Sequence, residues 1–194
     1  MLCGCSTGTV ESLNFWPHLR FSERPFGEAQ KLVSTTAQSG KSVATGTITR
    51  TTFREITIAQ GSGLEGFDVI RIYADGTGYA TVGDFEQGTA IIPLSLPAHT
   101  MEALHQAIKR DRPEDWLASY SSDLHDGAQG FAELQTSAGS TRCLLNNYFV
   151  PVRHLYAFCN EQVWPIIKES KPRPKLKKDY SRQVEYYRVF PKSN

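Results

Sequence analysis

The chain has 194 residues, 40% of them hydrophobic, and its 21 basic and 20 acidic side chains give a formal net charge of +1. This length suits one domain with appended segments, because domains centre on about 100 to 150 residues. The balanced charge excludes an overall field that would draw the protein to nucleic acid or to an anionic membrane. No apolar run approaches the ~20 residues of a membrane-spanning helix, so we expect none.

The first residues predict a site of lipid attachment. The run Leu2-Cys3-Gly4-Cys5-Ser6 is similar to the end of a bacterial lipoprotein signal, in which a Leu lies three positions before the modified Cys and a small residue lies directly before it. Cys5 is then the lipidated residue. Cys3 departs from the pattern, and the charged and apolar regions upstream are missing, as a start codon assigned too late would leave them. The alternative is a disordered terminus with two thiols.

Three parts are expected along the chain. Residues 1–42 form an N-terminal arm that is partly disordered, residues 43–168 form the domain, and residues 169–194 form a basic tail with an edge strand as an option. Within the domain, residues 43–59 are rich in β-branched side chains and predict one or two strands.

A β-hairpin is predicted around Asp75-Gly76, which separates β-rich runs at 67–73 and 78–82. A two-residue Asp-Gly loop favours a type I′ turn, in which both residues have positive φ. Residues 91–94 follow as a short strand. Pro93 predicts an edge position for it, because proline cannot donate a hydrogen bond to a neighbouring strand.

Two helices are predicted from apolar side chains at helical spacing. The first begins between residues 95 and 100, carries Met101, Leu104 and Ile108 on one face, and ends at Pro113, while Glu102, Gln106, Lys109 and Arg110 face water. The second begins near Pro151 and buries a stripe formed by Val152, Leu155, Tyr156, Cys159 and Val163.

Between the helices, residues 131–136 and 141–145 predict two more strands. Cys143 and Cys159 could meet where the second helix crosses the sheet. They form a disulfide in an oxidising compartment, or else two buried thiols. The predicted class is α+β, with a mainly antiparallel sheet, two helices packed on it, and a core in the order strand-strand-helix-strand-strand-helix.

The order of these elements resembles an uncharacterised family of small bacterial lipoprotein and secreted domains over residues 67–167. The likeness is carried by Ile72-Tyr73-Ala74-Asp75-Gly76-Thr77, the Met101 and Leu104 stripe, a loop at 120–126, a Gly-containing hairpin and a final helix that opens with Pro151. The resemblance implies an α+β domain outside the cytoplasm, with no assigned activity.

One loop carries residues that are typical of catalysis. Asp123, His125 and Asp126 lie within a polar run at 121–127 and could provide a general base with an orienting acid, or part of a metal site. Ser, Asp and Gly are also what turns are made of, and we favour that interpretation. The other histidines occur singly, without the spacing of metal ligands, so we expect neither a metal nor a cofactor.

The tail is locally basic, with Lys171, Arg173, Lys175, Lys177 and Lys178 interleaved with prolines and followed by four aromatic residues. Basic residues beside aromatics can bind single-stranded nucleic acid. We favour docking of the aromatics on the sheet or on a protein partner, because no nucleic-acid-binding module accompanies the run.

Three functions follow from these patterns. The leading hypothesis is a non-enzymatic binding module of the bacterial cell envelope, periplasm or outer membrane, whose partner is another protein and which touches the membrane through a lipid on Cys5. The second is a hydrolase or metal-dependent enzyme that uses Asp123, His125 and Asp126. The third is a cytoplasmic protein that binds nucleic acid or an acidic partner through its tail. The oligomeric state stays open.

Overall fold

The strands and helices come from a computed structural model that describes residues 32–36, 53–62, 66–84, 88–122 and 128–170. The strands are β1 (Leu32–Thr36), β2 (Phe53–Ser62), β3 (Gly66–Tyr73), β4 (Thr77–Asp84), β5 (Gly88–Ser95), β6 (Ser119–Ser122), β7 (Gln129–Thr136) and β8 (Gly139–Asn146). The helices are α1 (Ala98–Asp111), α2 (Arg153–Phe158) and α3 (Trp164–Glu169). A π-helical turn, Cys159–Val163, joins α2 to α3, and 3-10 turns occupy Pro113–Asp115 and Val150–Val152.

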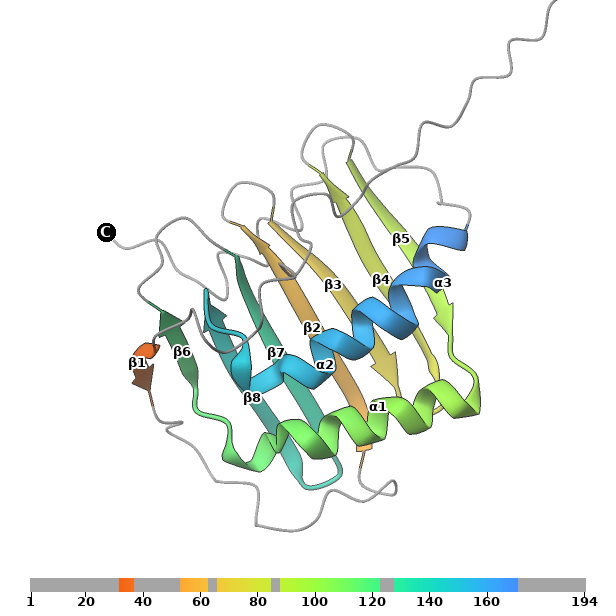
Figure 1. Cartoon of the computed structure of the whole chain (residues 1–194). Coiled ribbons are helices and arrows are strands. Elements are labelled where there is room, and N and C mark those ends of the chain that lie inside the picture. The colour runs from red at the N-terminus through yellow and green to blue at the C-terminus, as the bar shows by residue number, and fades with distance from the viewer. Residues whose placement is uncertain (1–31, 37–52, 63–65, 85–87, 123–127, 171–194) are drawn as a thin grey trace, which may run out of the picture.

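The strands form one sheet in the order β1-β6-β8-β7-β2-β3-β4-β5 (Figure 1). Neighbouring strands are antiparallel except for β6 and β8, which are parallel. From the β5 edge, α1 carries the chain across the sheet towards β6. The place of β5 confirms the edge position predicted from Pro93.

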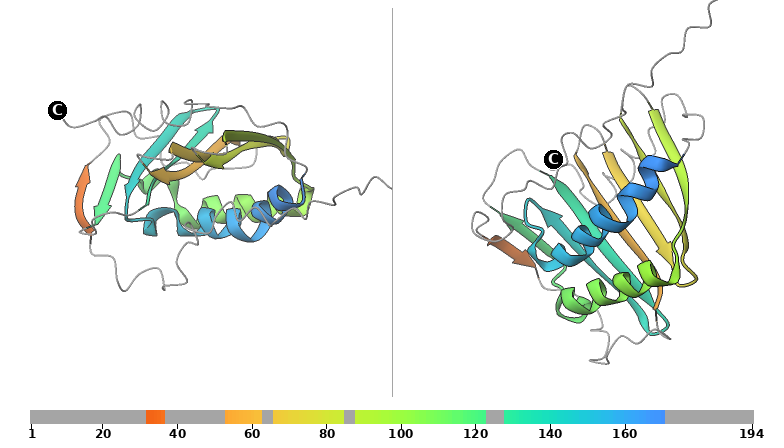
Figure 2. Two further views of the ribbon diagram at one scale, coloured as in Figure 1. Left: turned by 90° about the horizontal axis from the view of Figure 1, so that it is seen from above. Right: turned by 45° about the vertical axis from the view of Figure 1, so that its right-hand side comes forward.

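Both helical segments cover the same face of the sheet (Figure 2). Met101, Leu104 and Ile108 of α1 are buried, and so is the whole predicted stripe from Val152 to Val163. The Tyr156 hydroxyl donates a 2.7 Å hydrogen bond to the Ala59 carbonyl of β2, 97 positions away in the sequence. Gly130 of β7 leaves the room for this contact, since a Cβ there would lie 2.6 Å from the Tyr156 oxygen. The helix layer is therefore fixed to the centre of the sheet.

The turn between β3 and β4 differs from the prediction. The connection has three residues, Ala74 to Gly76, and only Gly76 among them has positive φ, at 84°. The Gly76 amide donates to the Tyr73 carbonyl at 3.0 Å, which is the geometry of a type I turn followed by a left-handed glycine. The Asp75 carboxylate accepts hydrogen bonds from the Thr77 amide (2.9 Å) and hydroxyl (2.6 Å). These local bonds favour the longer connection, so the type I′ prediction is wrong.

The α+β class, the mainly antiparallel sheet and the two helices packed on it are confirmed. The structure has more strands than the predicted core order, because β2 and β5 flank the hairpin, β6 follows α1, and β1 lies within the range expected to be an arm. Ser121 and Ser122 were expected in a loop and lie in β6, so that prediction is wrong. Of the helices in the described residues, none has the length and apolar character needed to cross a membrane.

Candidate interaction surface

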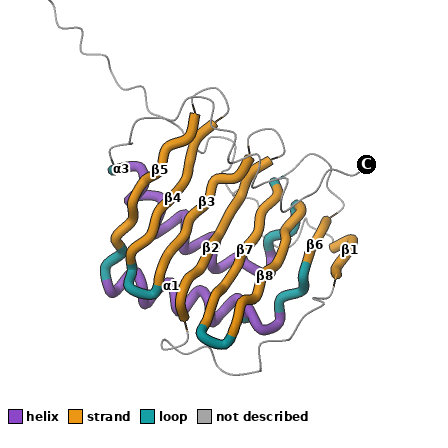
Figure 3. Tube along the Cα trace, turned by 180° about the vertical axis from the view of Figure 1, so that it is seen from behind, coloured by secondary structure: helices purple, strands orange, loops and turns teal. Residues whose placement is uncertain are grey.

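The sheet has a second face that points away from α1 and α2, and we call it the outer face (Figure 3). Strand residues alternate between the two faces, and the pairing registers align the outward residues of neighbouring strands. The outward side chains include Glu55, Thr57 and Ala59 of β2, Phe67, Val69 and Arg71 of β3, Tyr79 and Thr81 of β4, Ile91 and Pro93 of β5, Phe131 and Glu133 of β7, and Arg142 and Leu144 of β8.

An aromatic cluster lies at the centre of the outer face. The rings of Phe67 and Phe131 meet edge to face, with centroids 5.4 Å apart, and Ala59 lies beside them. The Arg142 guanidinium stacks over Phe131 at 4.4 Å from the ring centroid. Such a distance is within the ~6 Å range in which a cation is attracted to a ring face. The cluster is therefore packed by rings and a cation, and every described member comes from a strand.

A polar network lies beside this cluster. Arg71 Nε is 3.1 Å from Glu55 Oε1 and 3.2 Å from the Thr57 hydroxyl. The Arg71 guanidinium also lies 5.6 Å from the centroid of the Tyr79 ring on β4, within the ~6 Å range of a cation–π contact. The network has no net charge, because Glu55 and Arg71 form an ion pair.

Towards the β5 edge the outer face becomes apolar and accessible. Among the large hydrophobic side chains of the described residues, Ile91 is the exposed one, with 45% of its surface accessible. It pairs with Thr81, while the neighbouring pair is Tyr79 with the exposed Pro93. We call Arg71, Tyr79, Ile91 and Pro93 the β4–β5 patch. Tyrosine and arginine beside apolar side chains are the composition enriched where proteins bind proteins.

A buried carboxylate and an imidazole form a pair on the helix side. The Asp111 carboxylate at the end of α1 is 2.6 Å from His154 Nδ1, and it accepts hydrogen bonds from the backbone amides of His154 (3.1 Å) and Leu155 (2.8 Å). Burial raises the pKa of Asp111, and these donors partly oppose the rise. Because its oxygens cap the first turn of α2, Asp111 joins the two helices.

A pocket of about 360 Å³ opens between the β3–β4 turn and the first turns of α1. Its lining includes Asp75, Met101 and His105. The two Thr77 hydrogen bonds lower the pKa of the Asp75 carboxyl, so this carboxylate is stabilised as a turn-forming acceptor. The His105 ring packs edge to face on Phe53, at 5.3 Å between centroids. Both polar side chains thus have structural contacts of their own.

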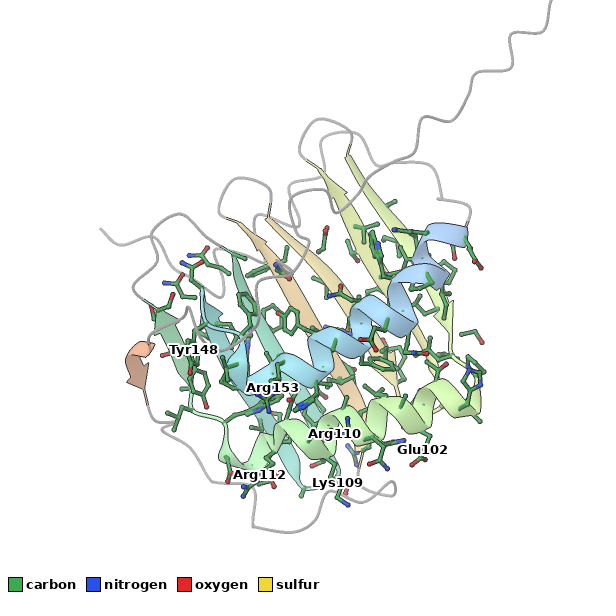
Figure 4. All side chains as sticks on the ribbon, in the orientation of Figure 1. Glu102, Lys109, Arg110, Arg112, Tyr148 and Arg153 are labelled. Atoms are coloured by element: carbon green, nitrogen blue, oxygen red, sulfur yellow. The ribbon has the colours of Figure 1, made fainter. Side chains whose placement is uncertain are left out.

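Basic side chains gather where α1 ends and α2 begins (Figure 4). The group comprises Lys109, Arg110, Arg112 and Arg153, with Tyr148 nearby and Glu102 further back along α1. Lys109 and Arg110 are exposed, as predicted, and lie in the last turn of α1, where positive charge offsets the helix dipole. Arg112 Nη2 is 2.7 Å from Asp115. The helix dipole therefore explains the positions of Lys109 and Arg110, and the ion pair with Asp115 explains that of Arg112.

The predicted site residues fall into two sets. Cys5, the loop residues Asp123, His125 and Asp126, and the tail residues Lys171, Arg173, Lys175, Lys177 and Lys178 lie outside the described residues. Cys143 and Cys159 are buried thiols that face the same core, and burial raises the pKa of both. Their oxidation to a disulfide stays a prediction. Within the described ranges, no three His, Cys, Asp or Glu side chains are grouped so that they could hold a metal ion.

The β4–β5 patch was not predicted from the sequence. The sequence does contain one indication of this patch. In the run from Ile91 to Leu94, strand alternation places two apolar side chains on each face of the sheet, so one of the two pairs points away from the core. Comparison with known proteins adds no candidate. No protein-family model matches the chain, and a search of curated proteins found no match either. The resemblance to the family of small bacterial lipoprotein domains therefore stays a prediction.

Proposed function

We propose that this chain is a binding module that holds another protein against the β4–β5 patch. The observation that carries the proposal is the exposure of Ile91, with 45% of its surface accessible, on a sheet face beside Tyr79 and Pro93. Apolar surface favours burial at roughly 25 cal/mol per Å², so a partner that covers this patch gains free energy without unfolding any described element.

The neighbouring side chains suit a protein partner. Tyr79 is partly buried and held by Arg71, so it offers apolar area and a hydroxyl without a large loss of side-chain entropy on binding. Arg71 is also paired with Glu55, which leaves the patch without net charge. A neutral patch of this kind favours a partner surface that is apolar at its centre and polar at its rim.

The location of the module is a second part of the proposal. The likeness of Leu2 to Ser6 to a lipoprotein signal supports attachment to the cell envelope through a lipid on Cys5. The non-reducing intact mass of natively expressed protein, taken separately from soluble and membrane fractions, tests this. A membrane-bound form that begins at Cys5 and carries lipid is expected. A soluble chain that begins at Met1 would contradict it.

Site-specific photo-crosslinking in the native cells tests the binding function. A benzophenone amino acid replaces Ile91 in one variant and the exposed Lys109 of α1 in a control. We expect one defined polypeptide to be joined at position 91 and not at 109, and that polypeptide, once purified, to bind the unmodified chain. No adduct at 91, or the same adducts at 91 and 109, would overturn the proposal.

A further inference from the structure

The centre of the outer face is more deeply buried than a single sheet layer explains. Phe67 has 0% of its surface exposed and Phe131 has 2%. No helix that the structure describes lies on this face (Figures 2 and 3). Arg142 stacks over the Phe131 ring, and in-plane neighbours such as Val69 and Leu144 shield the edges of both rings. A side chain that stands perpendicular to a sheet nevertheless stays accessible from above unless another layer covers it, and Phe67 is fully buried.

The same face provides an internal comparison. Ile91 and Pro93 of β5 point in the same direction as Phe67 and are exposed. The covering layer therefore lies over β3, β2 and β7 and stops before β5. Val69 and Leu144, which flank the aromatic cluster, are partly buried, as expected at the border of such a layer.

We propose that the segment of residues 179–190 of the same chain covers the Phe67 and Phe131 cluster. Its sequence contains Val184-Glu185-Tyr186-Tyr187-Arg188-Val189-Phe190, which is rich in the aromatic and β-branched residues that pack on sheets. These residues supply the apolar surface that the cluster needs from above.

Connectivity supports this segment. The described chain leaves the helix layer at α3, which contacts β5. β7 lies four strands from β5 in the sheet, a distance of about 19 Å at ~4.8 Å per strand. Residue 184 follows Ser170 by 14 positions, which span up to about 45 Å when extended. The linker between them therefore suffices to turn around the β5 edge. The inference holds whether or not the β4–β5 patch binds a partner.

Photo-crosslinking in the full-length purified chain tests the inference. A benzophenone amino acid replaces Leu144 in one variant and Val69 in a second, with Lys109 as the control position, and far-UV circular dichroism verifies the fold of each. After irradiation and trypsin digestion, we expect intramolecular links from 144 or 69 to the peptides of residues 183–188 or 189–192, and none from 109.

Three results would overturn the proposal. Links from both positions to residues 1–31 would assign the cover to the N-terminal part. Links only between two molecules, seen at twice the chain mass, would assign it to a second copy. No link at 144 or 69 in correctly folded variants would show that residues 179–190 do not lie on the cluster.

Discussion

The replacement of Asp111 by alanine should destabilise the fold strongly, because this side chain connects α1 to the start of α2. Its carboxylate is 1% exposed and accepts hydrogen bonds from the backbone amides of His154 and Leu155 in addition to its contact with His154 Nδ1. Alanine removes all three contacts and leaves the Leu155 amide, in a fully buried residue, without its acceptor.

The magnitude follows from these contacts. A buried amide that loses its acceptor costs about 1–3 kcal/mol, and the loss of an N-terminal cap costs about 0.5–2 kcal/mol. His154 is 29% exposed, so water can replace the contacts of its ring. We expect the free energy of unfolding to fall by about 2–4 kcal/mol for Asp111→Ala. For Asp111→Asn, which keeps one acceptor oxygen, we expect a fall of about 1–2 kcal/mol.

Urea unfolding measured by tryptophan fluorescence is a suitable assay, because the Trp116 indole donates to the Asp111 carbonyl at 2.9 Å and reports on this site. Lys109→Ala, an exposed change two residues away in the same turn of α1, is the matched control and should alter the free energy of unfolding by less than about 0.5 kcal/mol. If Asp111→Ala costs no more than this control, the connection between the helices is not made through Asp111.

Three further predictions concern the same core. Burial raises the pKa of Asp111 in the folded chain above the unfolded value of about 3.9, so between these two pKa values the folded chain binds more protons than the unfolded chain. In urea titrations, the stability of the native chain relative to Asp111→Asn should therefore rise as the pH falls from 7 towards 4. A fall in this relative stability would contradict the direction of the pKa shift. Gly130→Ala places a Cβ 2.6 Å from the Tyr156 oxygen and 2.5 Å from the Ala59 carbonyl oxygen. This substitution should lower the midpoint of thermal unfolding by several degrees more than the control Ala128→Gly. An unchanged midpoint would refute the close approach of Tyr156 to Gly130. In the reduced chain, Cys143 and Cys159 should resist alkylation by iodoacetamide at pH 8 until urea unfolds the protein, because burial keeps both thiols protonated. Peptide mapping that finds either cysteine alkylated in the folded chain would contradict this prediction.

Local patterns in the sequence predicted the elements with a clear period. The stripe from Val152 to Val163 repeats at helical spacing, and all five of its predicted residues are buried. Pro93 identified an edge strand because its missing amide proton is a local property. The π-helical turn inside the second helix left the stripe buried, so the extra residue did not disturb the prediction.

Long-range pairing explains what the sequence did not reveal. Ser119-Tyr120-Ser121-Ser122 has no apolar alternation, and its strand conformation depends on pairing with β8, where Ser119 aligns with Leu144. Asp111 and His154 are 43 positions apart, and neither one carries a local sign of the other. For the β4–β5 patch, alternation grouped Ile91 with Pro93, but only the register with β4 brings Tyr79 and Arg71 beside them.

The affinity of the crosslinked partner for an Ile91→Asp variant tests the central claim most directly. Ser95→Asp is the control, since it adds the same charge on the same strand and face, four residues from Ile91. Isothermal titration should give a Kd at least about tenfold weaker for Ile91→Asp, equal to about 1.4 kcal/mol, and a Kd near that of the native chain for Ser95→Asp. Equal affinity for Ile91→Asp and the native chain would show that the partner does not bind the β4–β5 patch.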